Sequence, residues 1–289
     1  HNSIVKDIIY NNNTNQIVSA DWNGTIIIWN LNYFSINKTL ELIGFNILSI
    51  TNNHALDQGW SGREKTVKAF NDADLGWCGH PSEEEEGSVY YGENGMRVKK
   101  DYSYGGFFTD GEKVAFVCFH DITSRLNLEN AKTVIEDAKE NADYVIVSIH
   151  WGVEYKHQPA KDLQIKPAHE FIDAGADFII GHHPHVVQTF EIYNGKMIFY
   201  SLGNFVFDQY WSQDTQEELA IWIVLDDNDD YEDNLRTKIY LFPMRSERSQ
   251  SILLNSGEYS KWIEKFISYG NYPENLKEQI RNGVIEINS

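Results

Sequence analysis

The sequence predicts an α/β protein whose sheet is covered on both faces. Between about residues 36 and 185, short apolar runs of strand length alternate with stretches of helical composition. The clearest run, 144–149, is nearly unbroken, which is typical of a strand buried on both faces. Such strands alternating with helices indicate a sheet with helices packed against it.

Strands and helices alternate in four successive units. The expected strands are 45–50, 113–119, 144–149 and 177–180. The expected helices are 61–73, 130–141 and 168–174. The helix at 130–141 has its apolar residues at helical spacing on one face, which we expect to pack on the sheet.

After residue 185 the strands are no longer separated by helices. Apolar segments at 191–193, 197–200, 219–225 and 238–242 predict a second, more antiparallel sheet. Asn194-Gly195 is typical of a type I′ turn and predicts a hairpin between the first two segments. Two short helices are expected at 259–269 and 273–281.

The first 33 residues form a different unit, and we expect the main domain to comprise 34–289. Residues 16–31 predict a hairpin of two strands joined at the turn Asn23-Gly24. This segment resembles a single blade of a WD-type propeller, which cannot close a ring alone. The alternative is that these residues are edge strands of the main domain, and the sequence favours neither.

The composition excludes several classes of partner. The chain has 24 Lys and Arg against 43 Asp and Glu, a formal net charge of −19 at pH 7. A nucleic-acid ligand requires a basic patch, and the densest charge run is the acidic Glu83–Glu86, expected to be a solvated loop. The sequence contains no run of about 20 apolar residues, so it predicts no membrane span.

The ends of the chain and its cysteines say little about its compartment. The first residue is His1 and no signal peptide is visible, so we expect a fragment or a processed chain. Cys78 and Cys118 have no metal-type spacing and do not make a disulfide framework, which leaves the redox compartment open.

Residues of metal-ligand type follow three of the expected strands. Asn53 and His54 follow the first strand, His150 follows the third, and His183 and His185 follow the fourth. Open α/β sheets bind ligands at the carboxyl ends of their strands. Imidazole binds Zn, Mn and Fe, and an amide oxygen binds hard cations. These residues together predict a divalent-metal site.

The segment His183-Pro184-His185 suits metal binding by its backbone. Alternate side chains of an extended segment face the same side, so both imidazoles would reach one ion. The proline restricts the backbone and limits the entropy lost when the ligands become ordered.

The chain resembles the CapA family, which is linked to poly-γ-glutamate capsule synthesis and related to calcineurin-like metallophosphatases. Several sequence blocks match those of the family in their order and in their residues, and the resemblance covers about 36–245. The matching blocks are 42–57, 146–155, 172–186 and 198–208. The resemblance implies a four-layer α/β/β/α sandwich, with its N-terminal part missing or replaced, and a site for two divalent ions (Mn, Fe or Zn) between the sheets.

By match, the resemblance assigns metal ligands and a catalytic residue. The implied ligands are Asn53, His150, His183 and His185. His54 would contact the leaving group or protonate it, as a general acid in metal-assisted hydrolysis of a phosphoester-like substrate.

Four more residues are implied around the ligands. Glu154 would be second-shell or face the substrate, and His182 would be a neighbour that shapes the site. Asn204 and Asp208 would line the rim.

The chain departs from the superfamily pattern upstream of Asn53. The acidic residue of an Asn-Leu-Glu-like motif is replaced in Asn30-Leu31-Asn32, and only Asp21 could substitute for the preceding Gly-Asp motif. Two cations about 3.5–4 Å apart usually need a bridging carboxylate. The alternatives are therefore a complete two-metal site, one metal held weakly, or none.

Two functions follow from the resemblance. The first is a role in synthesis or export of poly-γ-glutamate or another cell-surface polymer, with a metallophosphatase-type site. It implies an anionic polymer or a phosphorylated small molecule as partner, a capsule synthesis membrane complex, and a location at the cell surface or outside the cytoplasm. The second is a non-catalytic scaffold or polymer-binding module, favoured by the aromatic pair Tyr210-Trp211.

Overall fold

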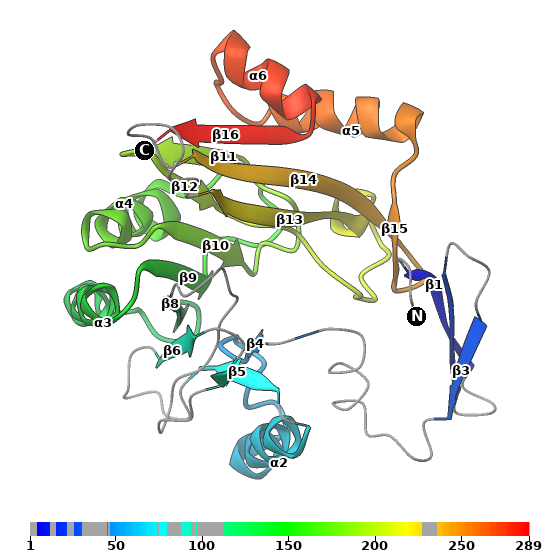
Figure 1. The fold of residues 1–289 in the computed structure, drawn as a ribbon, viewed down its shortest axis with the longest axis horizontal. Helices are drawn as coiled ribbons and strands as arrows, with labels where there is room; N and C mark the ends of the chain where they lie inside the picture. The colour runs from blue at the N-terminus through cyan, green and yellow to red at the C-terminus, as the bar shows by residue number, and fades with distance from the viewer. Residues whose placement is uncertain are drawn as a thin grey trace.

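The computed structural model describes residues 5–11, 16–21, 26–30, 45, 47–73, 75–79, 88–93, 96–97, 113–226 and 236–288. The features predicted at Leu31, Asn32 and Glu83–Glu86 lie outside these residues. The described part of the chain is a mixture of helices and several sheets (Figure 1), so the predicted α/β class is confirmed.

The largest sheet has seven strands in the order β11-β12-β10-β9-β8-β6-β7. Its central strands β12, β10, β9 and β8 run parallel, and β11, β6 and β7 pair antiparallel at the two edges. The strands are β6 (Ser88–Glu93), β7 (Met96–Arg97), β8 (Lys113–His120), β9 (Tyr144–His150), β10 (Phe178–His182), β11 (Phe190–Tyr193) and β12 (Lys196–Phe199). The strands predicted at 113–119, 144–149 and 177–180 are confirmed as its centre.

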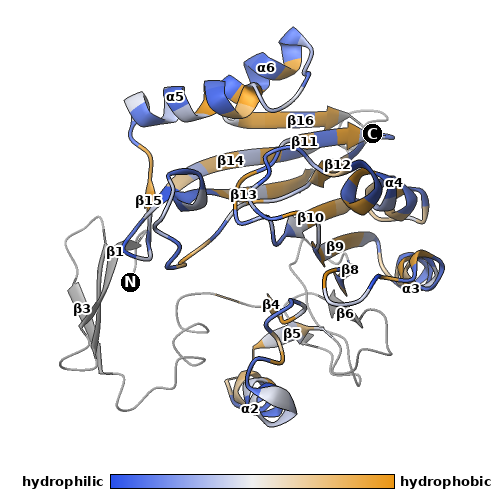
Figure 2. Ribbon diagram, turned by 180° about the vertical axis from the view of Figure 1, so that it is seen from behind, coloured by the Kyte–Doolittle hydropathy of each residue, from blue (hydrophilic) through white to orange (hydrophobic). Residues whose placement is uncertain are grey.

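Helices α3 (Leu128–Asn141) and α4 (Lys166–Asp173) cover one face of this sheet (Figure 1). Their apolar sides, including Ala131, Ile135 and Phe171, are fully buried against β8 and β9. In Figure 2 the solvent sides of these helices are hydrophilic and the strands behind them hydrophobic. α3 begins earlier than predicted because the Asn127 side chain accepts hydrogen bonds from the backbone N–H groups of residues 129 and 130.

A second, antiparallel sheet packs on the opposite face. It contains β13 (Glu217–Asp226), β14 (Arg236–Glu247), β15 (Gln250–Leu253) and β16 (Val284–Asn288). The predicted second sheet is thus confirmed for the segments at 219–225 and 238–242. The prediction was wrong for 191–193 and 197–200, which are β11 and β12 of the large sheet. Their hairpin is as expected, with positive φ at both Asn194 (48°) and Gly195 (74°).

Helices α5 (Ser256–Ile267) and α6 (Glu274–Arg281) close the core between the two sheets (Figure 1). Phe266 and Ile280 are fully buried in one cluster with Ile239 of β14 and Phe199 of β12. On the opposite face of the second sheet, Trp222 is 59% exposed among the described residues.

A smaller unit holds the first predicted strand. β4 (Ile47–Ser49) pairs in parallel with β5 (Gly76–Cys78), and α2 (Gly59–Asp72) connects them. This pair does not join the seven-stranded sheet; instead its cluster, which contains Phe70 and Trp77, packs against Phe116 of β8. A disulfide between Cys78 and Cys118 joins β5 covalently to β8.

The N-terminal strands β1 (Val5–Asn11), β2 (Gln16–Asp21) and β3 (Ile26–Asn30) form an antiparallel sheet of their own. The predicted β2–β3 hairpin is confirmed. The boundary near residue 33, and the assignment as a WD-type blade or as edge strands, stay predictions. None of the helices in the described ranges has the length and apolar character of a membrane span.

We expect the disulfide to stabilise the fold, because it closes a 40-residue separation and restricts the unfolded chain. Replacing Cys78 and Cys118 together by Ala should lower the free energy of unfolding by about 2–4 kcal/mol. Urea titrations with and without a thiol reductant measure this. The reductant should destabilise the parent and leave the variant unchanged; equal stability of parent and variant would contradict the prediction.

Candidate metal centre

The strand register brings three histidines to one level at the carboxyl ends of the central strands. His150 of β9 is the register partner of both His120 of β8 and His182 of β10. The His120 and His150 rings stack with centroids 6.0 Å apart. Sequence analysis did not select His120, although it also ends a buried strand. Its Nε2 accepts a hydrogen bond from the Thr123 backbone N–H at 3.0 Å, which indicates a supporting role rather than a ligand.

Three predicted ligands converge around His150. Its Nε2 lies 2.8 Å from Asn53 Oδ1 and 3.2 Å from His183 Nδ1. Two donors bound at about 2.1 Å to one cation, at roughly a right angle, are about 3 Å apart. Both distances from His150 Nε2 are compatible with donors to one ion as well as with hydrogen bonds, and these residue types fit a divalent metal.

His185 is oriented for metal binding by Asn204. The Asn204 Nδ2 group donates to Gln209 Oε1 (3.1 Å) and to the Thr215 carbonyl (2.9 Å). Its Oδ1 is therefore the atom that lies 2.7 Å from His185 Nδ1, and it accepts the imidazole proton. This leaves His185 Nε2 unprotonated and available to a metal, the usual arrangement behind a metal-bound histidine.

Glu154 lies closer to the ligands than expected. One donor atom each from Glu154, His183 and His185 lie within 4.8 Å of one another. A carboxylate is the anionic donor that the predicted ligand set lacked. The geometry thus groups Glu154 with the ligands rather than behind them, and its role as a ligand stays a prediction.

The backbone between the two ligand histidines is not extended, so that expectation was wrong. His183 and His185 have positive φ values of 97° and 59°, a conformation that costs about 1–3 kcal/mol for a residue other than glycine. Both rings still face the site, with centroids 6.0 Å apart. The buried Pro184 lies between them.

His54 lies at the exposed side of the site in a short chain of hydrogen bonds. Its Nδ1 donates to Asp57 Oδ2 at 2.9 Å, and its Nε2 accepts from Asn53 Nδ2 at 3.1 Å. Asn53 therefore connects His54 to His150. The sequence showed Asp57 only as part of a matching block, and its place three residues after His54 is the signal that could have identified it.

Burial keeps the inner imidazoles neutral. It lowers the pKa of His150 to about 2, with neighbouring histidines contributing further, and lowers the pKa of His182 to about 4. Burial also lowers the pKa of His183, against the opposing charge of Glu154. Neutral imidazoles can bind a metal without losing a proton. Since the unfolded chain takes up these protons below about pH 6.5, stability falls as the pH drops from there.

An aromatic rim surrounds His185. Tyr155 and Phe207 stack against its ring, with centroids 6.0 and 5.6 Å away. Trp211, 66% exposed, meets the edge of Tyr155. Asp208 is exposed on the same loop as Phe207, and its carboxylate makes no hydrogen bond or ion pair with the described residues. The structure thus brings together the four predicted ligands, His54, Glu154 and Asn204, and His182 lies beside His150 in the strand register.

Fold and site together define an α/β protein with a histidine-rich centre of metal-ligand type at its strand ends. The chain belongs to the bacterial capsule synthesis protein family PGA_cap, whose family model matches residues 21–209. This confirms the resemblance to CapA proteins.

This chain aligns with part of the length of each known relative. The chain is 38% identical over 197 residues to the capsule biosynthesis protein CapA of Bacillus anthracis, covering 66% of this chain and 47% of that protein. It is 38% identical over 188 residues to the PGA biosynthesis protein CapA of Bacillus subtilis, covering 63% and 48%. The chain therefore spans about half the length of these relatives. A solved structure, "Putative 5'-Nucleotidase from Staphylococcus aureus", matches 86% of this chain and 44% of its own, with 13% identity and a TM-score of 0.46.

We expect Asn204→Ala to weaken metal binding about 10- to 100-fold, because the His185 ring loses the acceptor that orients it. Competition with a chromophoric chelator for Zn²⁺ measures the affinity. Asn204→Asp keeps an acceptor for the His185 imidazole and should lose less of the metal affinity. Asn141→Ala, on the exposed side of α3, is the matched control. Unchanged affinity in a folded Asn204→Ala variant would contradict this role.

Proposed function

We propose that this chain is a CapA-like protein that takes part in the synthesis or export of poly-γ-glutamate or a related cell-surface polymer. We further propose that it holds at least one divalent ion and hydrolyses a phosphoester-like substrate. The family and the two CapA relatives support the first part. The second part rests on one observation, the convergence of Asn53, His150 and His183 at ligand spacing.

The donor set indicates where the ion would be held. Asn53, His150 and His183 form one group, and Glu154, His183 and His185 form another, so that His183 belongs to both. Imidazole, amide and carboxylate donors together suit Mn, Fe or Zn. When bound, such an ion polarises a phosphoryl oxygen and stabilises the developing charge.

Residues of the chain itself supply the proton and orient the side chain that donates it. The Asp57 carboxylate fixes the His54 ring, whose Nε2 faces the site side at Asn53. To act as a general acid, His54 takes up a second proton at Nε2 in place of the hydrogen bond from Asn53, and donates that proton to the leaving oxygen. Tyr155, Phe207 and Trp211 form the walls at which a substrate enters.

The disulfide supports a location outside the cytoplasm. Cys78–Cys118 is a structural disulfide between two elements of the core region, and such bonds persist in oxidising compartments. This agrees with a role at the cell surface and with a capsule synthesis membrane complex as partner, with poly-γ-glutamate or a phosphorylated small molecule as ligand.

A non-catalytic scaffold is the second candidate. The exposed aromatic side chains of Phe205, Tyr210 and Trp211 favour it, because exposed apolar side chains gathered in one place mark interaction surfaces. In this alternative the fold holds a polymer without hydrolysing it, and the catalytic test below separates the two.

Metal content is the first test of the site. We expect the purified chain to contain stoichiometric Mn, Fe or Zn by inductively coupled plasma mass spectrometry. His183→Ala/His185→Ala should lose it, because both donor groups then lack ligands. His169→Ala is the control, since His169 stacks on Tyr193 and pairs with Glu191 on another part of the sheet. A parent that takes up none of these ions would overturn the proposal.

Catalysis is tested at His54. With a panel of p-nitrophenyl phosphate mono- and diesters, His54→Gln should lower kcat about 10²- to 10⁴-fold with metal content unchanged, because only the proton donor is removed. Substrates with better leaving groups should be less affected, since they need less protonation. A metal-loaded parent that hydrolyses no ester, or a variant with full activity, would favour the scaffold.

A further inference from the structure

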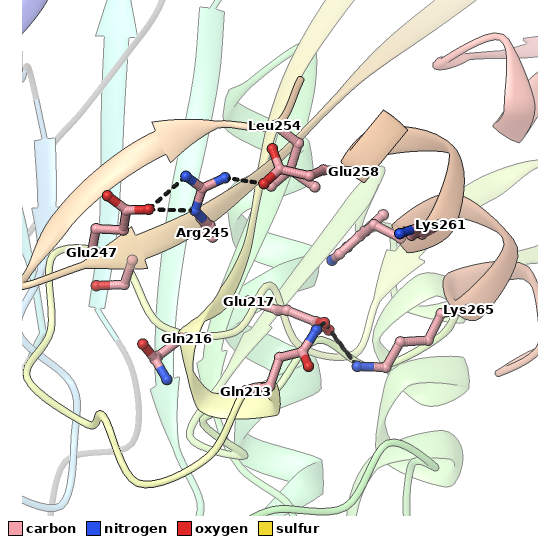
Figure 3. Close-up of a pocket in the computed structure, with 11 residues that line it drawn as sticks. Gln213, Gln216, Glu217, Arg245, Glu247, Leu254, Glu258, Lys261 and Lys265 are labelled. Carbon is pink, nitrogen blue, oxygen red and sulfur yellow. Dashed lines mark hydrogen bonds and ion pairs between the residues drawn. The ribbon is translucent and has the colours of Figure 1, made fainter. Parts of the chain in front are cut away.

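A cavity of about 540 Å³ lies between η2 (Asp214–Gln216), the end of β14 and α5 (Figure 3). It shares no lining residue with the candidate metal centre. Leu254 and Trp262 contribute its apolar lining, and charged or amide side chains line the rest. Small-molecule sites typically occupy about 300–1,000 Å³, so the cavity has room for a ligand the size of a short peptide.

Two of its three cations are already neutralised. Arg245 donates to Glu247 (2.9 Å from Nε) and to Glu258 (2.6 Å). Lys265 lies between Asp214 (2.7 Å) and Glu217 (2.7 Å). These pairs hold the walls in place, as the dashed lines in Figure 3 show for Arg245 and Lys265.

The third cation, Lys261, and the side-chain carbonyl oxygens of Gln213 and Gln216 are available to a ligand. Lys261 extends from α5 over the cavity in Figure 3, and its ammonium makes no ion pair with the described residues. Gln213 uses its Nε2 on Glu217 (3.2 Å), and Gln216 uses its Nε2 on the Ser212 carbonyl (2.9 Å). The Oε1 atoms of both glutamines accept no hydrogen bond from the part of the chain that the structure describes.

These open groups define the ligand. The ammonium of Lys261 would bind a carboxylate, whereas the two amide oxygens would accept hydrogen bonds from donors on the ligand. The local charge is also informative, because three carboxylates (Glu217, Glu247 and Glu258) and three cations line the cavity. A chain of bare carboxylates would add unbalanced negative charge, whereas a ligand that brings an ammonium as well as a carboxylate keeps the cavity neutral.

We propose that this cavity binds a short zwitterionic peptide, with its carboxylate on Lys261 and its ammonium on the Oε1 atoms of Gln213 and Gln216. The ammonium also faces the exposed carboxylates of the wall. The inference stands on the cavity alone and does not depend on metal binding or hydrolysis elsewhere in the chain.

Isothermal titration of the purified chain with the zwitterionic dipeptide alanylalanine tests this. We expect saturable binding. The N-acetylated dipeptide and the dipeptide with its carboxyl group amidated should each bind about tenfold more weakly or worse, because each lacks one charged group. Lys261→Met should weaken binding of the parent dipeptide by a similar factor. Lys261 is exposed, so the variant is expected to fold.

Lys277→Met is the matched control, because Lys277 is on α6 and pairs only with Glu274 among the described residues. No saturable binding by the parent chain would overturn the proposal. So would equal binding by Lys261→Met, or equal binding of the N-acetylated dipeptide. Binding of poly-glutamate without binding of the dipeptide would also overturn it, in favour of a polymer groove.

Discussion

The candidate site depends on how the ends of the central strands are held together. The buried indole of Trp151 connects these strand ends. Trp151 is fully buried and its Nε1 donates to the Tyr200 carbonyl at 2.9 Å. It fits only because β10 has a glycine there: a Cβ at Gly181 would lie 2.0 Å from the Tyr200 carbonyl oxygen and 2.4 Å from Trp151 Nε1. This contact therefore joins the ends of β9, β10 and β12. The candidate ligand His150 is the last residue of β9, and the candidate ligand His183 comes directly after β10.

A buried pair of glutamines extends this constraint to the loop that carries Glu154. Gln164 Nε2 donates to Gln188 Oε1 at 2.7 Å, and Gln188 Nε2 donates to the Lys156 carbonyl at 2.7 Å. Gly152, at φ 88°, leaves room for Gln164, because a Cβ would lie 2.5 Å from its amide carbon. A buried amide left unpaired costs about 1–3 kcal/mol, so the loop is held in one conformation even though Glu154 itself is exposed.

The regular elements could be predicted because their signals are local. The apolar run at 144–149 and the helical spacing at 130–141 depend on neighbouring residues alone. The sheet to which β11 and β12 belong could not be predicted, since an antiparallel hairpin has the same pattern in either sheet. The turn at His183 and His185 was missed for a related reason: positive φ at a residue other than glycine has no signal in the local sequence. Glu154 has no local signal either, because its place depends on buried glutamines far along the chain.

The histidine cluster at the strand ends is held together at a free-energy cost. His183 and His185 have strained backbones, and the inner imidazoles are kept neutral by burial. His150 Nε2 lies 2.8 Å from Asn53 Oδ1 and 3.2 Å from His183 Nδ1, and a neutral His150 ring makes a full hydrogen bond with only one of them. The surrounding structure maintains this geometry through Trp151, Asn204 and the glutamine pair. A net charge of −19 adds a long-range attraction for cations, which favours the metal binding proposed above.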